Sequence, residues 1–368
     1  MTTLVKTQHG LASIPPYVPG KPIEDVKREY GLTDVIKLAS NENPLGVSPK
    51  VLEALHTALN EINYYPDAQS YYLREALSRH LGFAADHVAL GNGADGLIRE
   101  VCLAYLEEGD EVIVSRSSFP VYDVSVQVVC GQVVKTSLKK NGLDLAAMAS
   151  AITPRTKMIF VCNPNNPTGT IVTAAEAEQF MAQVPERVLV VFDEAYFEFV
   201  DSAEYPDSLQ YVRQGRKNVL VLRTFSKVYG IAGIRLGYGL ACPEVMAALQ
   251  TVRESFPVNR LAQAAGLAAL EDREFLRQTV EMNQSGRLYL YQEFERLGLP
   301  YIRSHTNFVL VKAGPQAVRI FQALLRQGVI VRPCNGYDLP EHLRITVGTP
   351  EQNARLIKAL ELVLPTLG

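Results

Sequence analysis

Between about residue 87 and residue 241 the chain alternates short apolar runs with longer amphipathic stretches. The runs are rich in β-branched residues and almost continuous in hydrophobicity, which is typical of strands covered on both faces. They lie at residues 87–90, 111–115, 132–136, 157–162, 188–192, 219–223 and 236–241, and amphipathic stretches such as 97–106 and 174–183 separate most of them. This alternation predicts an α/β fold whose large domain holds a mostly parallel seven-stranded sheet between helices. The last connection is short, so we expect the final strand to pair antiparallel.

The pattern changes after Pro257. A long helical region at roughly 260–298 is followed by strand-like runs at 307–312, 329–332 and 342–347, with helical stretches at 317–327 and from residue 350. This mixture predicts a smaller α+β domain. The N-terminal arm is rich in proline, so we expect it to be extended and to pack against the small domain. We therefore assign residues 41–257 to the large domain, and residues 1–40 and 258–368 to the arm and the small domain.

Composition and charge exclude several classes of function. The net charge of −3 over 368 residues, without a basic run, offers no surface for nucleic acid. The apolar stretches have the length of strands and the N-terminal segment lacks the apolar core of a secretory signal, so we expect no membrane association and no export. The five scattered cysteines contain no CxxC pair. They favour a reducing, cytoplasmic setting and predict neither a disulfide framework nor a metal site.

Residues 88–96, VALGNGADG, match the glycine pattern GxGxxG between a predicted strand and a predicted helix. Backbone N–H groups at such a helix N-terminus can bind a phosphate. A dinucleotide site would need an acidic residue about 20 positions further on, at the end of the next strand. That strand ends at Arg116 instead, and its acidic residues, Asp110 and Glu111, lie at its start. The motif leaves a single-phosphate site, a dinucleotide site and a plain turn open.

Two further segments follow predicted strands. NPNNPTG at residues 163–169 predicts a rigid loop at the ligand-binding edge of an α/β sheet, where an Asn amide could donate to a ring oxygen, although the same residues suit a structural turn.

In the second segment a buried strand runs into Asp193 and Glu194, with Tyr196 close behind. A buried acid is costly unless it meets a cation or a metal, although an acid at a strand end can also face solvent. No GxxxxGK[ST] loop accompanies a magnesium role, whereas an Asp facing a protonated pyridine nitrogen fits.

The most informative stretch is LRTFSKVYGIAGIRLG at residues 222–237. Lys227 follows a predicted strand between hydroxyl residues, Thr224 and Ser226, and Arg235 lies eight positions further on. The hydroxyls and the arginine suit a phosphate, and a lysine with a lowered pKa can condense with an aldehyde. A solvated loop lysine is the alternative interpretation of Lys227 alone.

Taken in order, these four segments resemble the fold-type I enzymes that use pyridoxal 5′-phosphate (PLP), and specifically the histidinol-phosphate aminotransferase family. The resemblance covers nearly the whole chain. It includes PYVPGK at 16–21, NENPLG at 41–46, NYYPD at 63–67, VRPCNGY at 331–337 and LRITVG at 343–348.

The resemblance implies a role for each matching residue. Lys227 would hold PLP as a Schiff base and then act as the base that moves the substrate proton. Asp193 would pair with the pyridine nitrogen, and Tyr196 and Asn166 would hydrogen-bond the ring 3′-oxygen. Phe119 would stack on the ring. The phosphate would be held by Ala94 and Asp95 through their backbone, and by Thr224, Ser226 and Arg235.

The resemblance also implies a substrate pocket and a homodimer. Arg344 resembles the arginine that takes the substrate's carboxylate or phosphate, and Arg332 and Tyr17 would line the same pocket. Tyr65 resembles a residue that reaches the phosphate in the other subunit's site. The family usually has Glu where this chain has Gly96. Because the phosphate contacts are mainly backbone, we expect PLP binding to survive this difference.

The implied activity is that of a histidinol-phosphate:2-oxoglutarate aminotransferase of histidine biosynthesis, acting on a small-molecule amino donor and a 2-oxo acid. A guanidinium grips both phosphate and carboxylate, so one pocket can serve both substrates. An aromatic amino acid aminotransferase and a threonine-phosphate decarboxylase share these motifs and stay open. A nucleotide-dependent oxidoreductase leaves Lys227 unexplained. A PLP-sensing regulator would need a DNA-binding module, for which the segment before Asn41 is too short.

Overall fold

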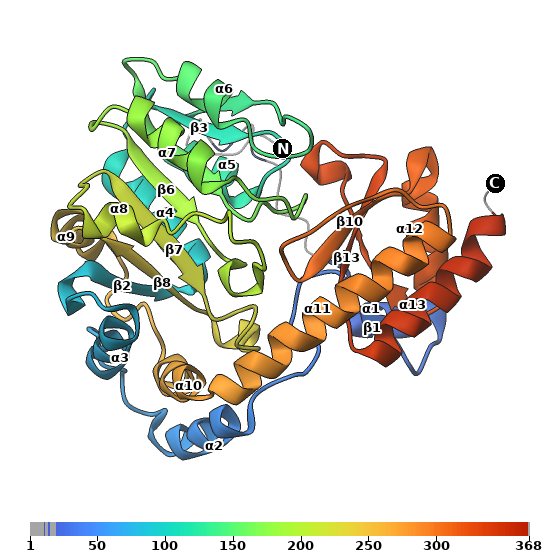
Figure 1. The fold of residues 1–368 in the computed structure, drawn as a ribbon. Helices are drawn as coiled ribbons and strands as arrows, with labels where there is room; N and C mark the ends of the chain where they lie inside the picture. The colour runs from blue at the N-terminus through green and yellow to red at the C-terminus, as the bar shows by residue number, and fades with distance from the viewer. Residues whose placement is uncertain (1–10, 12–13, 15–19, 367–368) are drawn as a thin grey trace, which may run out of the picture.

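The computed structural model describes residues 11, 14 and 20–366. A seven-stranded sheet in the order β2-β8-β7-β6-β5-β3-β4 forms the core of the larger part of the molecule, on the left of Figure 1. The strands are β2 (Val88–Asn92), β3 (Glu111–Ser115), β4 (Gln132–Thr136), β5 (Thr156–Cys162), β6 (Leu189–Asp193), β7 (Val219–Thr224) and β8 (Leu236–Ala241). The strands from β7 to β4 pair in parallel, whereas β8 pairs antiparallel with both β7 and β2. The predicted sheet and the antiparallel final strand are both confirmed.

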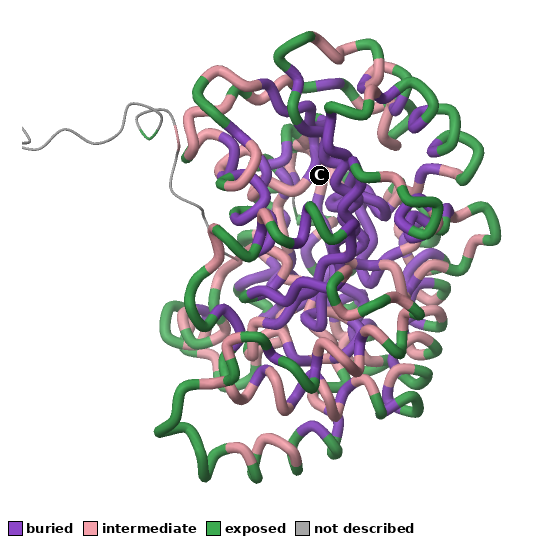
Figure 2. The backbone as a smooth tube through the Cα atoms, turned by 90° about the vertical axis from the view of Figure 1, so that its left-hand side faces the viewer, coloured by how far each residue is buried: buried purple, intermediate pink, exposed green. Residues whose placement is uncertain are grey.

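The continuous apolar runs form strands because helices cover the sheet on both faces. Successive residues of β6 enter different cores: Val190 and Phe192 belong to one cluster, whereas Val191 belongs to the other. Helices α4 (Gly93–Tyr105), α5 (Val121–Val128) and α9 (Pro243–Val252) contribute to the second cluster. The buried centre of the molecule is visible in Figure 2.

The other face packs against helices from several parts of the chain. These are α2 (Pro49–Ala58), α3 (Tyr71–Leu81), α6 (Leu145–Ser150), α7 (Ala174–Gln183), α8 (Leu209–Arg213) and α10 (Arg260–Glu271). Helix α10 packs on α2 and α3 and places Ala262, Ala265 and Ala269 in this core.

A smaller α+β unit follows along the chain. Its four-stranded antiparallel sheet has the order β12-β13-β10-β9 and consists of β9 (Tyr301–Ile302), β10 (Phe308–Lys312), β12 (Arg332–Pro333) and β13 (His342–Thr346). Helices α11 (Arg273–Arg296), α12 (Ala317–Arg326) and α13 (Pro350–Val363) accompany it (Figure 1). A short sheet joins β1 (Ile36–Lys37) to β11 (Val329–Ile330), and α1 (Ile23–Tyr30) packs near α12. The domain boundaries near residues 41 and 257 stay predictions.

Two expected elements are divided in the structure. The helical region at 260–298 breaks at Asp272, whose carboxylate caps α11 by accepting from the Phe275 N–H and also accepts a hydrogen bond from Ser48. The run expected as one strand at 329–332 forms β11, which pairs with β1, and β12, which pairs with β13. Distant segments contribute to both breaks, because Ser48 contacts Asp272 and because β11 and β12 pair with different strands.

No helix in the described part of the chain combines the length and the apolar character that crossing a membrane requires. Among the same residues, no group of three His, Cys, Asp or Glu side chains could hold a metal ion. All five cysteines are free thiols.

Candidate active site

A cavity of about 270 Å³ opens at the carboxyl ends of β5, β6 and β7, where open α/β sheets bind ligands. It brings together predicted site residues from segments far apart in the sequence. These are Ala94, Asp95, Phe119, Asn166, Asp193, Tyr196, Thr224, Ser226, Lys227, Arg235, Arg332 and Arg344. Tyr65 does not line the cavity of its own chain, and Tyr17 lies outside the described residues.

Lys227 lies in this cavity three residues beyond the end of β7, and its Nζ donates to the carbonyl of Ser40 at 3.3 Å. Burial and, to a smaller extent, the nearby Arg344 guanidinium together lower the pKa of Lys227 to about 8. An amine with this pKa is partly neutral near physiological pH. It can therefore act as a nucleophile or as a base.

Asp193 ends β6 and is 3% exposed. Its carboxylate accepts hydrogen bonds from Tyr122 Oη at 2.6 Å and from the Ala195 N–H at 3.1 Å. Burial raises its pKa to about 6, against the effect of these two hydrogen bonds. Within the described residues no cation forms an ion pair with it. The cavity therefore offers a buried carboxylate that lacks a positive partner.

An anion cradle lies in the same cavity, at the point where α4 begins at Gly93. Thr224 Oγ1 donates to Ser226 Oγ at 3.0 Å, and the Arg235 guanidinium lies 3.8 Å from the Asp95 carboxylate. A Cβ on Gly93, whose φ is +72°, would come within 2.6 Å of Arg235 Nη2, and one on Gly237 would lie 2.4 Å from the Ala94 nitrogen. The glycines leave this space for hydroxyls, a guanidinium and a helix N-terminus, which together suit a phosphate.

Arg344 on β13 is 5% exposed and finds no carboxylate partner among the described residues. Its Nη1 donates to Asn166 Oδ1 at 2.5 Å and its Nη2 donates to the Ala39 carbonyl at 2.7 Å, while its Nε has no hydrogen-bond partner in the described structure. A buried guanidinium with neutral acceptors and an unsatisfied donor is a site for an anion. Arg332 pairs opposite Arg344 across β12 and β13 and lines the same cavity.

Tyr196 lines the same cavity. Its ring packs edge-on against Phe308 at 5.2 Å, and Lys227 Nζ lies 5.8 Å from its ring centre. Burial raises the pKa of Tyr196, so its hydroxyl keeps its proton at neutral pH. Phe119 lines the cavity and packs edge-on against Tyr122 at 5.6 Å.

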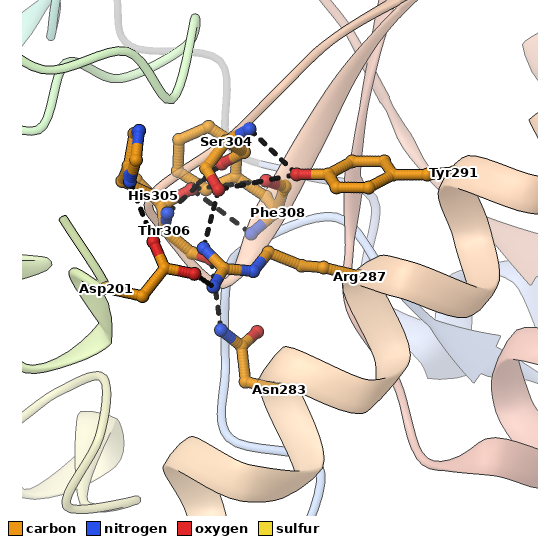
Figure 3. A network of polar contacts seen from close by, with 8 residues as sticks. All are labelled: Asp201, Asn283, Arg287, Tyr291, Ser304, His305, Thr306 and Phe308. Carbon is orange, nitrogen blue, oxygen red and sulfur yellow. Dashed lines mark hydrogen bonds and ion pairs between the residues drawn. The ribbon is translucent and has the colours of Figure 1, made fainter.

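A polar network fixes the segment at residues 304–306, which leads into Phe308 at the start of β10 (Figure 3). Arg287 of α11 donates to the Ser304 carbonyl at 2.5 Å and forms an ion pair with Asp201 at 2.8 Å. His305 contacts the same Asp201 at 2.9 Å, and Asn283 donates to the Thr306 carbonyl at 3.1 Å. The network ties α11 to the Asp201 segment. It thereby holds Phe308 beneath Tyr196 and Arg344.

Three cavity-related residues received no role from the sequence. Tyr122 hydrogen-bonds Asp193, Tyr337 lies 3.3 Å from Arg344 Nη1, and Asn41 hydrogen-bonds Tyr196 at 2.8 Å. Asn41 and Tyr337 belong to the NENPLG and VRPCNGY motifs, and Tyr122 lies three residues after Phe119. These motifs could have indicated that the residues are functional, but the contacts themselves depend on the fold.

Tyr65 is 79% exposed and stacks on Phe256, with ring centres 4.6 Å apart. Ile62, Tyr64 and Tyr72, which lie within seven positions of it in the sequence, are also exposed. The segment thus presents an apolar surface away from the cavity of its own chain.

The fold and the cavity define an enzyme class in which a lysine, a buried carboxylate and an anion cradle meet at the strand ends of one sheet. The family model described as aminotransferase class I and II matches residues 33–360, and the chain belongs to this family. The family resemblance and the fold predicted from the sequence are confirmed.

Similar proteins carry a more specific name. A histidinol-phosphate aminotransferase from Moorella thermoacetica is 49% identical over 99% of this chain and 94% of its own. One from Symbiobacterium thermophilum is 48% identical over 95% and 96%. The crystal structure of histidinol-phosphate aminotransferase from Sinorhizobium meliloti in complex with pyridoxal-5′-phosphate has a TM-score of 0.91 at 29% identity and covers 100% of both chains. The aspartate aminotransferase from Thermus thermophilus with maleate has a TM-score of 0.83 at 26% identity, covering 97% of this chain and 98% of that one.

Proposed function

We propose that this chain is a PLP-dependent aminotransferase that takes the amino group of histidinol phosphate and passes it to 2-oxoglutarate. The observation that carries the proposal is a single cavity holding the partly neutral amine of Lys227, the unpaired buried carboxylate of Asp193 and the unpaired guanidinium of Arg344. The names of the relatives, which match nearly the whole chain, support the choice of substrate.

The residues present fit PLP. Thr224, Ser226, Arg235 and the backbone of Ala94 and Asp95 form the cradle that would hold its phosphate. Asp193 would face the ring nitrogen, where a protonated pyridine would supply the cation that stabilises the charged form of this buried carboxylate. When bound, PLP supplies an electron sink that stabilises negative charge on the substrate carbon. Asn166 and Tyr196 would contact the ring oxygen, and Phe119 the ring face.

The chain's own groups then handle the proton and the substrate. The amine of Lys227, which the Ser40 carbonyl orients, would take a proton from the carbon that bears the amino group and deliver it to the aldehyde-derived carbon of PLP. Arg344 binds the phosphate of one substrate and a carboxylate of the other, because its planar fork fits both. Arg332 lines the same pocket, and Tyr17 stays a predicted member of it.

The proposed enzyme is a homodimer. The exposed apolar surface around Tyr65 is typical of a protein–protein interface, and a second copy of this chain would bury it. The family resemblance also implies that Tyr65 contacts the phosphate in the partner's site. We also keep the prediction of a cytoplasmic setting, for which the five free thiols are the support.

The test is a spectrum and an assay. The purified protein should take up PLP with a visible absorbance band that borohydride removes, and Lys227→Ala should abolish that band and lower turnover by about 10³-fold or more. Uptake of no PLP contradicts the proposal. Histidinol phosphate and phenylalanine should each be assayed with 2-oxoglutarate. A kcat/KM that favours phenylalanine by orders of magnitude overturns the substrate assignment, and release of carbon dioxide from threonine phosphate indicates a decarboxylase instead.

A further inference from the structure

The segment from Leu38 to Asn43, between β1 and α2, touches three functional groups in consecutive residues. The Ala39 carbonyl accepts from Arg344, the Ser40 carbonyl accepts from Lys227, and the Asn41 side chain contacts Tyr196. Asn41 is 1% exposed and has a φ of +59°, a conformation that Asn adopts more readily than most residues. Burial restricts the orientations that this side chain can adopt.

The hydrogen bonds of Asn41 determine which end of its amide faces Tyr196. The Asn41 N–H donates to Thr346 Oγ1 at 3.0 Å, so the Thr346 hydroxyl is free to donate to Asn41 Oδ1, which lies 3.2 Å away. The oxygen of the amide is thereby an acceptor toward Thr346, and Nδ2 is the donor toward Tyr196 Oη at 2.8 Å. The carbonyl of Asn41 also accepts from Asn307 Nδ2 at 2.9 Å, which anchors the residue to the small unit.

This polarity dictates the direction of the Tyr196 proton. Because Tyr196 Oη accepts from Asn41, its own O–H must donate elsewhere. Within the described residues Tyr196 Oη has no other hydrogen-bond partner, and Tyr196 lines the cavity. The phenolic proton is therefore directed into the cavity.

We propose that Asn41 is a positioning residue, which donates to the Tyr196 oxygen so that the phenolic proton is available to the ring oxygen of PLP. This inference rests on the proposed function, since it needs PLP in the cavity. It adds a residue that acts through Tyr196 without touching the substrate. A carboxylate at position 41 would reverse the polarity, because it would accept the phenolic proton and withdraw it from the ring oxygen.

The test is the pH titration of the visible absorbance of the PLP-loaded protein. The colour changes when the nitrogen that joins Lys227 to PLP loses its proton. A hydrogen bond donated to the neighbouring ring oxygen withdraws charge from that oxygen, so this proton is lost more easily. Asn41→Asp should therefore raise the apparent pKa of the colour change by about one pH unit, the worth of one hydrogen bond to a charged group. Asn41→Gly tolerates the positive φ, carries no charge and removes the donor, and it should shift the titration in the same direction.

A double-mutant cycle separates this role from simple charge or misfolding. In a Tyr196→Phe background the shift caused by Asn41→Gly should vanish, and that of Asn41→Asp should fall to the small through-space effect of its carboxylate. Asn43→Asp is the matched control. It places the same carboxylate in the same segment, where the amide now donates to the Val228 carbonyl and to Thr279, and it should leave the titration unchanged.

The inference is overturned if each Asn41 variant shifts the titration by the same amount whether or not the Tyr196 hydroxyl is present. So would a shift from Asn43→Asp as large as that from Asn41→Asp. A wild-type protein that takes up no PLP shows no band in any variant. That outcome overturns the proposed function and this inference together. Failure of the expected shifts in a protein that binds PLP overturns this inference alone.

Discussion

At the scale of residues, Lys227, Asp193 and Arg344 each lack an ion-pair partner among the residues that the structure describes. Burial lowers the pKa of Lys227 and raises that of Asp193, so in both cases it favours the uncharged form. Such unmet charges are costly in a folded chain and are concentrated at functional sites. The proposed cofactor and substrate supply the missing partners, which explains why the chain retains these residues in one cavity.

Replacing Lys227 by Met is expected to stabilise the PLP-free protein at neutral pH. The pKa of Lys227 falls from 10.5 to about 8 on folding, so the unfolded chain binds more protons between these values. The lysine's destabilising effect is therefore full below pH 8 and disappears as the pH rises to 10.5. Urea unfolding should show a gain of about 1–3 kcal/mol at pH 7 that vanishes near pH 10.5. The exposed Lys358→Met is the control, and a gain independent of pH would contradict the assignment.

Arg344→Lys should lower kcat/KM for both the phosphate and the carboxylate substrate by about a hundredfold. An ammonium cannot keep the contacts with Ala39 and Asn166 and still grip an anion with two parallel donors, and a hydrogen bond to a charged group contributes about 1.5–3 kcal/mol. Steady-state kinetics on each substrate, with the exposed Arg319→Lys as control, checks this expectation. A loss confined to one substrate would indicate separate anion sites.

At the scale of elements, the end of β6 directs two neighbouring acids to opposite sides of the sheet. Asp193 faces the cavity, whereas Glu194 forms a buried ion pair with Arg223 of β7 at 2.8 Å. The Arg223 guanidinium also lies 3.6 Å from the centre of the Phe197 ring. This pair joins the ends of the two strands that carry Asp193 and Thr224. We infer that it supports the geometry of the site from behind.

Arg223→Met should cost about 3–5 kcal/mol, because it leaves the fully buried Glu194 carboxylate without a cation. The double replacement Glu194→Leu with Arg223→Met should recover much of that loss, since it removes both charges. Thermal or urea unfolding of the two variants measures the difference. If the double variant is the less stable of the two, the uncompensated charge is not the cause.

At the scale of the whole molecule, each proposed site uses residues of two chains. Mixing Lys227→Ala with Tyr65→Phe protein, followed by subunit exchange, should therefore restore activity. In each mixed dimer one site keeps both Lys227 and the partner's Tyr65, so roughly a quarter of all sites become intact. Activity assays before and after exchange measure the recovery, with unexchanged mixtures as control. A mixture that stays as inactive as its parents contradicts the shared site, and a chain that sediments as a monomer contradicts the homodimer.

Much of this protein follows from local pattern. Apolar runs at strand length predict β5, β6 and β7, because a strand covered on both faces must be apolar on both. The positions of Lys227, Asp193 and the NPNNPTG segment directly after such strands place them at one edge of a parallel sheet, where the cavity lies.

Tertiary structure decided which neighbours those residues meet. The sequence has two adjacent acids at 193 and 194, and only the pairing of β6 with β7 determines that Glu194 meets Arg223 while Asp193 faces the cavity. The contact of Asn41 with Thr346 joins residues 305 positions apart, and no local pattern contains it. Periodicity encodes which side of an element is buried, whereas hydrogen-bond partners and counter-charges come from the packing of distant segments.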